Sequence, residues 1–307
     1  MKLPRNATRT RTRRLTTGLL LAALLAVLPA PATAAASAST GAPAAAAATG
    51  GWNKENCVPA AGHPRPVVLV HGTFADGTNN WLGLAPYLVQ RGYCVHSFDY
   101  GRLPGVPLIG GLTPMEESAG ELAAHIDRVL ARTGASEVDL VGHSQGGLMP
   151  RYYLKHHPGA ADKVNAFVAI APSTNGTTLL GLTKLLDLFP GLDRAIAEAA
   201  PALSQQVAGS DFLRELNADG YTVPGVTYTV IATRYDEVVT PYRSQFIEEP
   251  GVRNVLLQDL CPLNISEHAT IGLLDRTAFH ETANALDPAN ARPTNCWSFL
   301  SQGLSSK

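Results

Sequence analysis

The sequence predicts an α/β protein in which helices cover both faces of a mainly parallel β-sheet. From residue 66 onward, short apolar runs alternate with amphipathic helical patterns, and the first run, residues 67–70, is apolar at every position. Continuous apolar strands are typical of a parallel sheet buried on both faces. Apolar residues make up 45% of the 307 residues, which is ample for a packed core.

The expected elements follow from these patterns in chain order. Strands are expected at residues 67–70, 93–98, 137–141, 164–171, 226–232 and 254–257. Helices are expected at residues 81–91, 114–132, 145–156 and 269–285. Gly92 and Gly134 follow the first two helices and are typical residues for a helix end.

Residues 176–217 interrupt this alternation, because no strand is expected there between two strands of the sheet. Its first part is rich in apolar side chains: Leu179, Leu180, Leu182, Leu185, Leu186, Leu188 and Phe189. A helical stretch at 193–200 follows. We interpret the segment as a helical cap over the strand ends. It is either a fixed cap or a mobile lid, and the sequence leaves both open.

The N-terminus predicts an export signal, and hence a secreted protein. Six basic residues and no acid precede the apolar run 18–28: Lys2, Arg5, Arg9, Arg11, Arg13 and Arg14. That run is half of the ~20 residues that span a bilayer, and Ala32-Thr33-Ala34 fits a cleavage site. We therefore expect a signal peptide at 1–34, a low-complexity linker at 35–50 and one domain at 51–307. Arg13-Arg14 leaves Sec and twin-arginine export both open.

Removal of residues 1–34 takes away six positive charges and no negative one, so the formal net charge falls from −1 to −7. An acidic mature chain is a poor partner for nucleic acid, and it has no basic patch for anionic lipid. We expect a monomer without cofactor.

Four cysteines remain in the mature chain: Cys57, Cys94, Cys261 and Cys296. An even number in an exported protein indicates two disulfides, for which three connectivities exist. We favour Cys57–Cys94 and Cys261–Cys296, since each pair is close in sequence and tethers a terminal region. The spacings do not fit a zinc site, and no acidic cluster predicts a calcium site.

The pentapeptide Gly142-His143-Ser144-Gln145-Gly146 matches G-x-S-x-G, and it lies between an expected strand and an expected helix. This placement is that of a nucleophile elbow, in which small residues let the chain turn tightly and expose the serine. The helix N-terminus behind the serine favours developing negative charge. The motif predicts the α/β-hydrolase fold with Ser144 as nucleophile, against a plain glycine-rich turn as the alternative.

A serine nucleophile needs a general base, and in this fold the order along the chain is Ser, acid, His. His268 and His280 both lie far enough along the chain. His280 falls inside an expected helix, whereas His268 falls in the loop before it, where a base can reach the elbow. We therefore expect His268 to be the base.

The acid that orients the histidine should follow the strand at 226–232. Asp236 is the expected residue, Glu237 is the runner-up, and Asp259 is a more distant possibility.

The oxyanion hole needs two backbone N–H groups. One is expected from Gln145, and the other from the loop after residues 67–70, where Thr73 is preferred to Phe74. The Thr73 hydroxyl is a possible third donor. His71 precedes Ser144 in the chain and is expected to be structural.

With these residues placed, residues 66–286 resemble the secreted bacterial triacylglycerol lipases and esterases, especially those of actinomycetes, and the catalytic motifs are similar to those of CalB-type yeast lipases. The matching stretches are 70–73, 142–147, 209–213 and 236–241, together with His268. The resemblance implies hydrolysis of fatty-acyl esters through an acyl-enzyme, without cofactor, and with a possible role for the lipid–water interface.

One stretch departs from that pattern. Bacterial lipases often have Pro-His-x-Gly-Thr after the strand that follows the elbow helix, whereas residues 171–177 here are Ala-Pro-Ser-Thr-Asn-Gly-Thr and lack the histidine. The alternatives are therefore an esterase of short or polymeric esters or an acyltransferase and, more remotely, a non-catalytic binding protein on a hydrolase scaffold.

Overall fold

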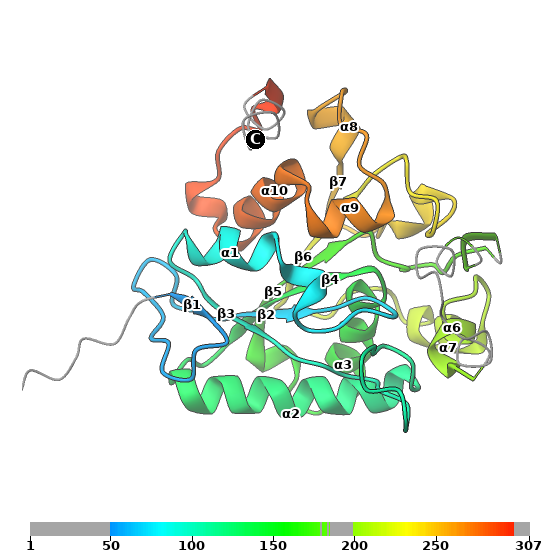
Figure 1. Ribbon diagram of the computed structural model, residues 1–307, viewed down its shortest axis with the longest axis horizontal. Coiled ribbons are helices and arrows are strands. Elements are labelled where there is room, and N and C mark those ends of the chain that lie inside the picture. Colours follow the sequence, from blue (N-terminus) through cyan, green and yellow to red (C-terminus); the bar gives the residue numbers. More distant parts are fainter. Residues whose placement is uncertain (1–49, 179, 183, 185–198, 298–307) are drawn as a thin grey trace, which may run out of the picture. The chain divides into compact units, whose positions relative to one another are not determined.

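A seven-stranded, fully parallel sheet forms the centre of the protein, with the strand order β1-β3-β2-β4-β5-β6-β7 (Figure 1). The computed structural model describes residues 50–178, 180–182, 184 and 199–297, so the expected signal peptide and nearly all of the expected linker lie outside the described residues. The strands are β1 Gly51–Trp52, β2 Val67–Val70, β3 Cys94–Ser97, β4 Val138–His143, β5 Val164–Ile170, β6 Thr227–Ala232 and β7 Arg253–Leu256. The predicted α/β class is confirmed; the two-residue β1 was too short to produce a sequence pattern.

Helices pack on both faces of this sheet, because successive strand side chains point to opposite sides. In β2, Val67 and Leu69 pack in the cluster that includes α1 (Leu84–Val89) and α10 (Arg276–Leu286). Val68 and Val70 pack in the cluster that includes α2 (Met115–Thr133) and α3 (Met149–His156). Figure 1 shows α2 and α3 together on one side of the strands and α1 and α10 on the other.

The remaining helices among the described residues are short. They are α6 Pro201–Gln205, α7 Asp211–Asn217, α8 Leu257–Leu260 and α9 His268–Leu273, with 3-10 turns η1 Asn79–Trp81, η2 Ser144–Gly147, η3 Ala161–Lys163, η4 Tyr242–Gln245 and η5 Pro288–Asn290.

Helix boundaries differ from the sequence prediction near the C-terminus. The single helix expected at 269–285 is wrong, because α9 ends at Leu273 and Asp275 then caps α10 by accepting the N–H of Ala278 at 2.8 Å. His268 is also not in a loop. It is the first residue of α9, because Glu267 makes a capping box with Thr270 directly before it.

Two other expected helices begin later than predicted. The helix expected from residue 81 begins at Leu84, because Asp76 accepts the N–H groups of Thr78 and Asn79 and sets up the η1 turn instead. The helix expected from residue 145 is divided into η2 and α3. Pro150 has no N–H to donate, so it suits the first turn of α3.

The expected cap, residues 176–217, is described only in part. Thr177 and Val207 form an isolated parallel bridge, and α6 and α7 follow it. In α6, Leu203 packs with Phe74 at the end of the sheet, and Leu182 lies against the same cluster. Five of the apolar residues named above (Leu179, Leu185, Leu186, Leu188 and Phe189) and residues 193–198 lie outside the described residues.

Disulfides join Cys57 to Cys94 and Cys261 to Cys296, the two pairs that the sequence favoured. The first ties the segment after β1 to β3, and the second ties the chain after η5 to the end of α8. Among the described helices, none combines the length and the apolar character that crossing a membrane requires.

Two histidines, one buried and one partly buried, lie on the α2 side of the sheet. His96 comes from β3, and His125 from α2 stacks on Phe98 at a ring distance of 4.3 Å. Burial, with a smaller contribution from Arg132, lowers the pKa of His96 to about 4. Burial, followed by the charge of Arg128, lowers the pKa of His125 to about 3. Both imidazoles are therefore neutral in the folded protein near neutral pH.

We predict that this pair makes the fold sensitive to mild acid. Below an unfolded pKa of about 6.5, the unfolded chain takes up protons that the folded chain does not, so stability falls with pH until about pH 4. One pH unit below 6.5, the free energy of unfolding is lower by about 1.4 kcal/mol for each fully buried imidazole. For this pair, which is partly exposed, we expect a decrease of roughly 2 kcal/mol. Urea unfolding at pH 7.5 and at pH 5.5 measures this decrease in the free energy of unfolding. Between the two pH values, the free energy of unfolding of the double variant His96→Gln/His125→Gln should fall by about that much less than that of the wild type. An equal fall in the variant and the wild type contradicts the prediction.

Candidate active site

Ser144 lies on a tight turn between β4 and α3, and only 3% of its surface is exposed. Its backbone φ of 56° is in the left-handed region. A Cβ atom at Gly142 would lie 1.7 Å from the carbonyl oxygen of Gly146, and one at Gly146 would lie 2.0 Å from that of Val70. The two glycines are therefore required by close approach of the backbone, as the sequence motif predicts.

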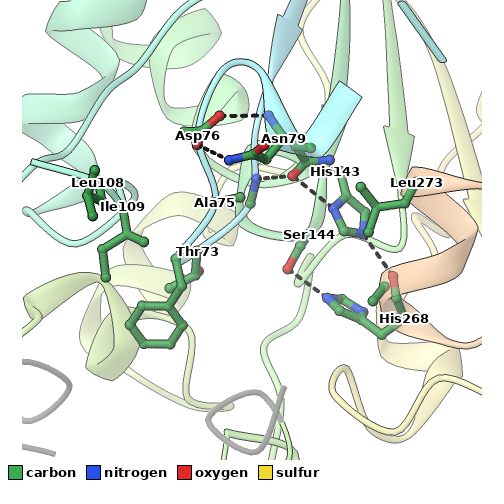
Figure 2. Close-up of a pocket in the computed structure, with 14 residues that line it drawn as sticks. Thr73, Ala75, Asp76, Asn79, Leu108, Ile109, His143, Ser144, His268 and Leu273 are labelled. Atoms are coloured by element: carbon green, nitrogen blue, oxygen red, sulfur yellow. Dashed lines mark hydrogen bonds between the residues drawn. The ribbon is translucent and has the colours of Figure 1, made fainter. Parts of the chain in front are cut away.

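Ser144, His268 and Asp236 form a continuous hydrogen-bonded row, and Figure 2 shows its Ser144–His268 part. The Nε2 atom of His268 is 2.9 Å from the Ser144 hydroxyl, and its Nδ1 atom is 2.8 Å from Oδ2 of Asp236. All three side chains are buried. A carboxylate can only accept, so Nδ1 of His268 carries the proton and Nε2 is free to accept the serine proton. This arrangement can generate a serine nucleophile.

The Asp236 carboxylate accepts four hydrogen bonds. Its Oδ1 atom accepts the N–H groups of Val238 at 2.9 Å and Val239 at 2.7 Å, so the loop after β6 folds around it. Its Oδ2 atom accepts from His268 and from Nε2 of Gln245 at 3.0 Å. Gln245 was not anticipated, because it comes from the η4 turn nine residues along the chain and matches no motif.

The other residues weighed for these roles lie elsewhere. Glu237 is exposed, and Asp259 is exposed and pairs with Arg234 at 3.6 Å. His280 is on α10, where its Nε2–H donates to the carbonyl of Arg292. His71 is fully buried and stacks on Tyr100 at 4.2 Å, in keeping with the structural role expected of it.

The loop after β2 passes beside Ser144 and carries Thr73 and Phe74. The N–H of Phe74 donates to the carbonyl of Gly110 at 2.9 Å, so it is already committed and the alternative oxyanion donor is disfavoured. Phe74 has a φ of 62°, and its side chain is buried in the cluster with Leu203. Thr73, which lines the pocket together with Ser144, and Gln145, the residue after Ser144, are left as the expected pair.

The Thr73 hydroxyl accepts two amide hydrogen bonds. Nε2 of Gln145 donates to Oγ1 at 3.1 Å, and Nε2 of Gln206 donates to it at 3.0 Å. Gln145 also donates to the carbonyl of Gly111, and Gln206 also donates to the carbonyl of Ala202. These contacts fix the orientation of the two side-chain amides. With both acceptor positions occupied, the hydroxyl hydrogen must point elsewhere. Gln206, which follows α6, has no sequence signature.

A pocket of about 290 Å³ opens beside Ser144 (Figure 2). Leu108 and Ile109 lie on one side of the serine and Leu273 on the other, and Phe74 and Ala269 also line the pocket. Asp76 and Asn79, joined to each other by a hydrogen bond, lie at a polar end. The walls favour an apolar ligand.

Burial keeps three side chains around the site, those of His71, His143 and Tyr100, uncharged near neutral pH. Burial lowers the pKa of His71 to about 4, against a smaller opposing effect of its contact with the Gly72 carbonyl. Burial, and next the nearby His268, lower the pKa of His143 to about 3. Burial also raises the pKa of Tyr100 far above its usual value. Among the described residues, no group of three or more His, Cys, Asp or Glu side chains is placed to hold a metal ion.

Residues 65–219 match the alpha/beta hydrolase fold family, which is about half of the chain. Lipase B of Pseudozyma antarctica is 29% identical over 214 residues, which cover 67% of this chain and 57% of that protein. A triacylglycerol lipase of Pseudarthrobacter phenanthrenivorans is 39% identical over 92 residues, 28% of this chain and 27% of that protein. The chain thus spans little more than half of the first relative and about a quarter of the second.

Solved structures show the same fold. The crystal structure of Aspergillus fumigatus lipase B superimposes with a TM-score of 0.59 at 24% identity, covering 81% of this chain and 59% of that one. A lipase of Bacillus licheniformis in its mature form gives a TM-score of 0.54 at 17% identity, covering 72% and 91% of the two chains.

We predict that a fluorophosphonate probe labels Ser144, because its hydroxyl is hydrogen-bonded to Nε2 of His268. Ser144→Ala should remove the label, as located by peptide mass spectrometry. Asp236→Asn should slow labelling by roughly 10²–10⁴-fold, since the wrong tautomer of His268 is then favoured. The matched control is Glu237→Gln, which removes the adjacent exposed carboxylate and should label at the wild-type rate. Equal slowing in both variants would reject Asp236 as the orienting acid.

Proposed function

The chain belongs to the alpha/beta hydrolase fold family, and from this premise we propose that it hydrolyses carboxylic esters, as a lipase or carboxylesterase, with Ser144, His268 and Asp236 as its catalytic residues. The hydrogen-bonded row from Ser144 to Asp236 is the observation that carries the proposal. The names of the relatives, which include a lipase B and a triacylglycerol lipase, support esters as the substrate class.

In the proposed reaction, the Ser144 oxygen attacks the ester carbonyl carbon while Nε2 of His268 accepts the hydroxyl proton. The carbonyl oxygen becomes an oxyanion, and Asp236 stabilises the imidazolium through Nδ1–H. Collapse of the intermediate breaks the carbon–oxygen bond of the leaving group, which takes the proton from His268 and leaves an acyl-serine. Water then attacks the acyl carbon, gives its proton to His268, and the serine is released with that proton.

The oxyanion is proposed to bind the N–H groups of Thr73 and Gln145 and the Thr73 hydroxyl. Because Gln145 and Gln206 occupy both lone pairs of that hydroxyl, its hydrogen is available to the substrate oxygen without losing a protein partner. Donors fixed before the reaction stabilise the developing charge at little reorganisation cost.

Residues 176–217 are proposed to form a cap at the carboxyl ends of β5 and β6. Gln206 contacts Thr73, and Thr177 donates to the carbonyl of Val238 in the Asp236 loop. Ser173, in the stretch that departs from the bacterial lipase pattern, donates to Oε1 of Gln206 at 2.9 Å. The cap segment therefore buttresses both the oxyanion turn and the acid.

Export of the protein, with cleavage of residues 1–34, is part of the same proposal. The basic and apolar N-terminal segments support it, and so do the two disulfides, which persist in oxidising compartments. The resemblance to secreted bacterial lipases agrees with that location, and no nucleic-acid partner is proposed.

The defining experiment is ester hydrolysis by the purified mature protein. Ser144→Ala should lower kcat by several orders of magnitude, on the order of 10⁴–10⁶-fold, because no nucleophile remains. Full activity in this variant would refute the proposal, and an inactive wild type that a fluorophosphonate leaves unlabelled would identify a binding protein. Rates along a p-nitrophenyl ester series and on emulsified triglyceride separate a lipase, active on long chains, from an esterase of short esters.

The Thr73 hydroxyl is tested by a matched pair of variants. Thr73→Val keeps the shape but removes the hydroxyl, so kcat should fall by roughly 10²-fold with KM little changed, because the donor acts on the transition state. Thr73→Ser keeps the hydroxyl and should stay close to wild type. A valine variant as active as the serine variant would show that the two backbone N–H groups suffice.

A further inference from the structure

His143 and Asn80 form a buried contact chain between the oxyanion turn and His268. Oδ1 of Asn80 accepts the N–H of Gly72 at 2.9 Å, and the same oxygen is 3.2 Å from Nδ1 of His143. Nε2 of His143 is 2.9 Å from the backbone carbonyl oxygen of His268, a contact drawn in Figure 2. Asn80 and His143 are 4% and 6% exposed, so water does not replace these contacts.

The imidazole of His143 faces an acceptor at each nitrogen. The N–H of Gly72 can only donate, so the Asn80 amide must present its oxygen, and Nδ2 of Asn80 is left as a buried atom without a partner. A neutral imidazole has a single N–H for these two oxygens, and only an imidazolium could donate to both. Burial and the neighbouring His268 keep His143 neutral. Therefore only one of the two contacts, to Asn80 or to the His268 carbonyl, contains a hydrogen and is a hydrogen bond.

The ring also has no freedom to move away. A Cβ atom at Gly272 of α9 would lie 2.7 Å from Cδ2 of His143, so the helix that begins with His268 packs directly on this ring. On the other side, a Cβ atom at Gly72 would lie 3.5 Å from Nδ1. The imidazole is thus enclosed between the oxyanion turn and α9.

His268 needs such an anchor because it is the first residue of α9, and helix ends fray. Glu267 holds the N–H groups of Ala269 and Thr270, but these contacts fix the turn and not the His268 carbonyl. A displacement of about 1 Å in a reacting group can cost ~10²-fold in rate. The His143 contact acts on the main chain of the residue that must accept the Ser144 proton.

We propose that His143 is a positioning residue which carries its single proton on Nε2 and donates it to the His268 carbonyl, thereby holding the imidazole of His268 in line with Ser144. Its Nδ1 atom lies unprotonated against Asn80, whose oxygen serves the Gly72 N–H. The inference rests on the proposed function, since its effect is on the base of that reaction. The shorter of the two contacts is the one assigned the proton.

Two amide substitutions separate the two contacts. The side-chain nitrogen of His143→Gln can reach the Nε2 position and donate to the His268 carbonyl. The shorter His143→Asn can reach only the Nδ1 position, toward Asn80, and His143→Leu has neither donor. We expect kcat to fall by about 10²-fold in the leucine and asparagine variants, with KM within about threefold, and to recover to within about fivefold of wild type in the glutamine variant.

The matched control is His125→Gln, which removes a partly buried imidazole from α2, a helix that supplies none of the site residues. It should lower the melting temperature but leave kcat unchanged. The melting temperature of every variant is measured beside kcat, KM and the fluorophosphonate labelling rate. If the leucine variant does not fold, the comparison of glutamine with asparagine still decides, because both are polar and similar in size.

Three outcomes would overturn the proposal: wild-type kcat in the leucine variant, equal kcat in the glutamine and asparagine variants, or recovery by asparagine alone. Failure of the proposed function gives a different result, namely an inactive wild type or an active Ser144→Ala. An active, Ser144-dependent enzyme that is indifferent to residue 143 therefore rejects only the positioning role.

Discussion

The tight turn at Ser144 is the constraint from which the rest of the site follows. A non-glycine residue in the left-handed region costs roughly 1–2 kcal/mol, and persists only when its surroundings hold it. Gly142 and Gly146 allow the turn to close against its own carbonyl and against that of Val70. The turn that follows β4 is thereby packed against the carboxyl end of β2. The same close approach brings Thr73, in the loop after β2, to the side of the serine.

That contact buries polar groups, and a buried polar group that is left unpaired costs about 1–3 kcal/mol. The Gln145 side chain is wholly buried, donates to Gly111 and Thr73, and accepts from Tyr100 at 3.1 Å. Gln206 brings the chain after α6 into the same network. Loops from four parts of the sequence are therefore joined by hydrogen bonds at Thr73 and Gln145, so the turn that we propose to bind the oxyanion is held in place by the protein itself.

The sequence could predict those parts of the site that depend on local signals. The elbow has a motif, β2 has a continuous apolar run, and the positions of Asp236 and His268 follow from the order of strands. Gln206 and Gln245 could not be predicted, because their roles arise from contacts with residues 133 and nine positions away and leave no periodic trace. The break between α9 and α10 at Asp275 was not predicted because the helical periodicity of the sequence continues across it. The break is visible only in the structure, where the Asp275 side chain caps α10.

The geometry of the site also requires that His143, which lies next to His268, be neutral. In the proposed reaction His268 becomes positively charged, and Asp236 is the carboxylate that balances it. The ring of His143 is 5.1 Å from that of His268. A second positive charge at that distance would oppose proton transfer to His268 by about 3 kcal/mol at an effective dielectric constant of about 20. Burial of His143 removes this penalty, so the side chain that anchors the base can lie against it without competing for its proton.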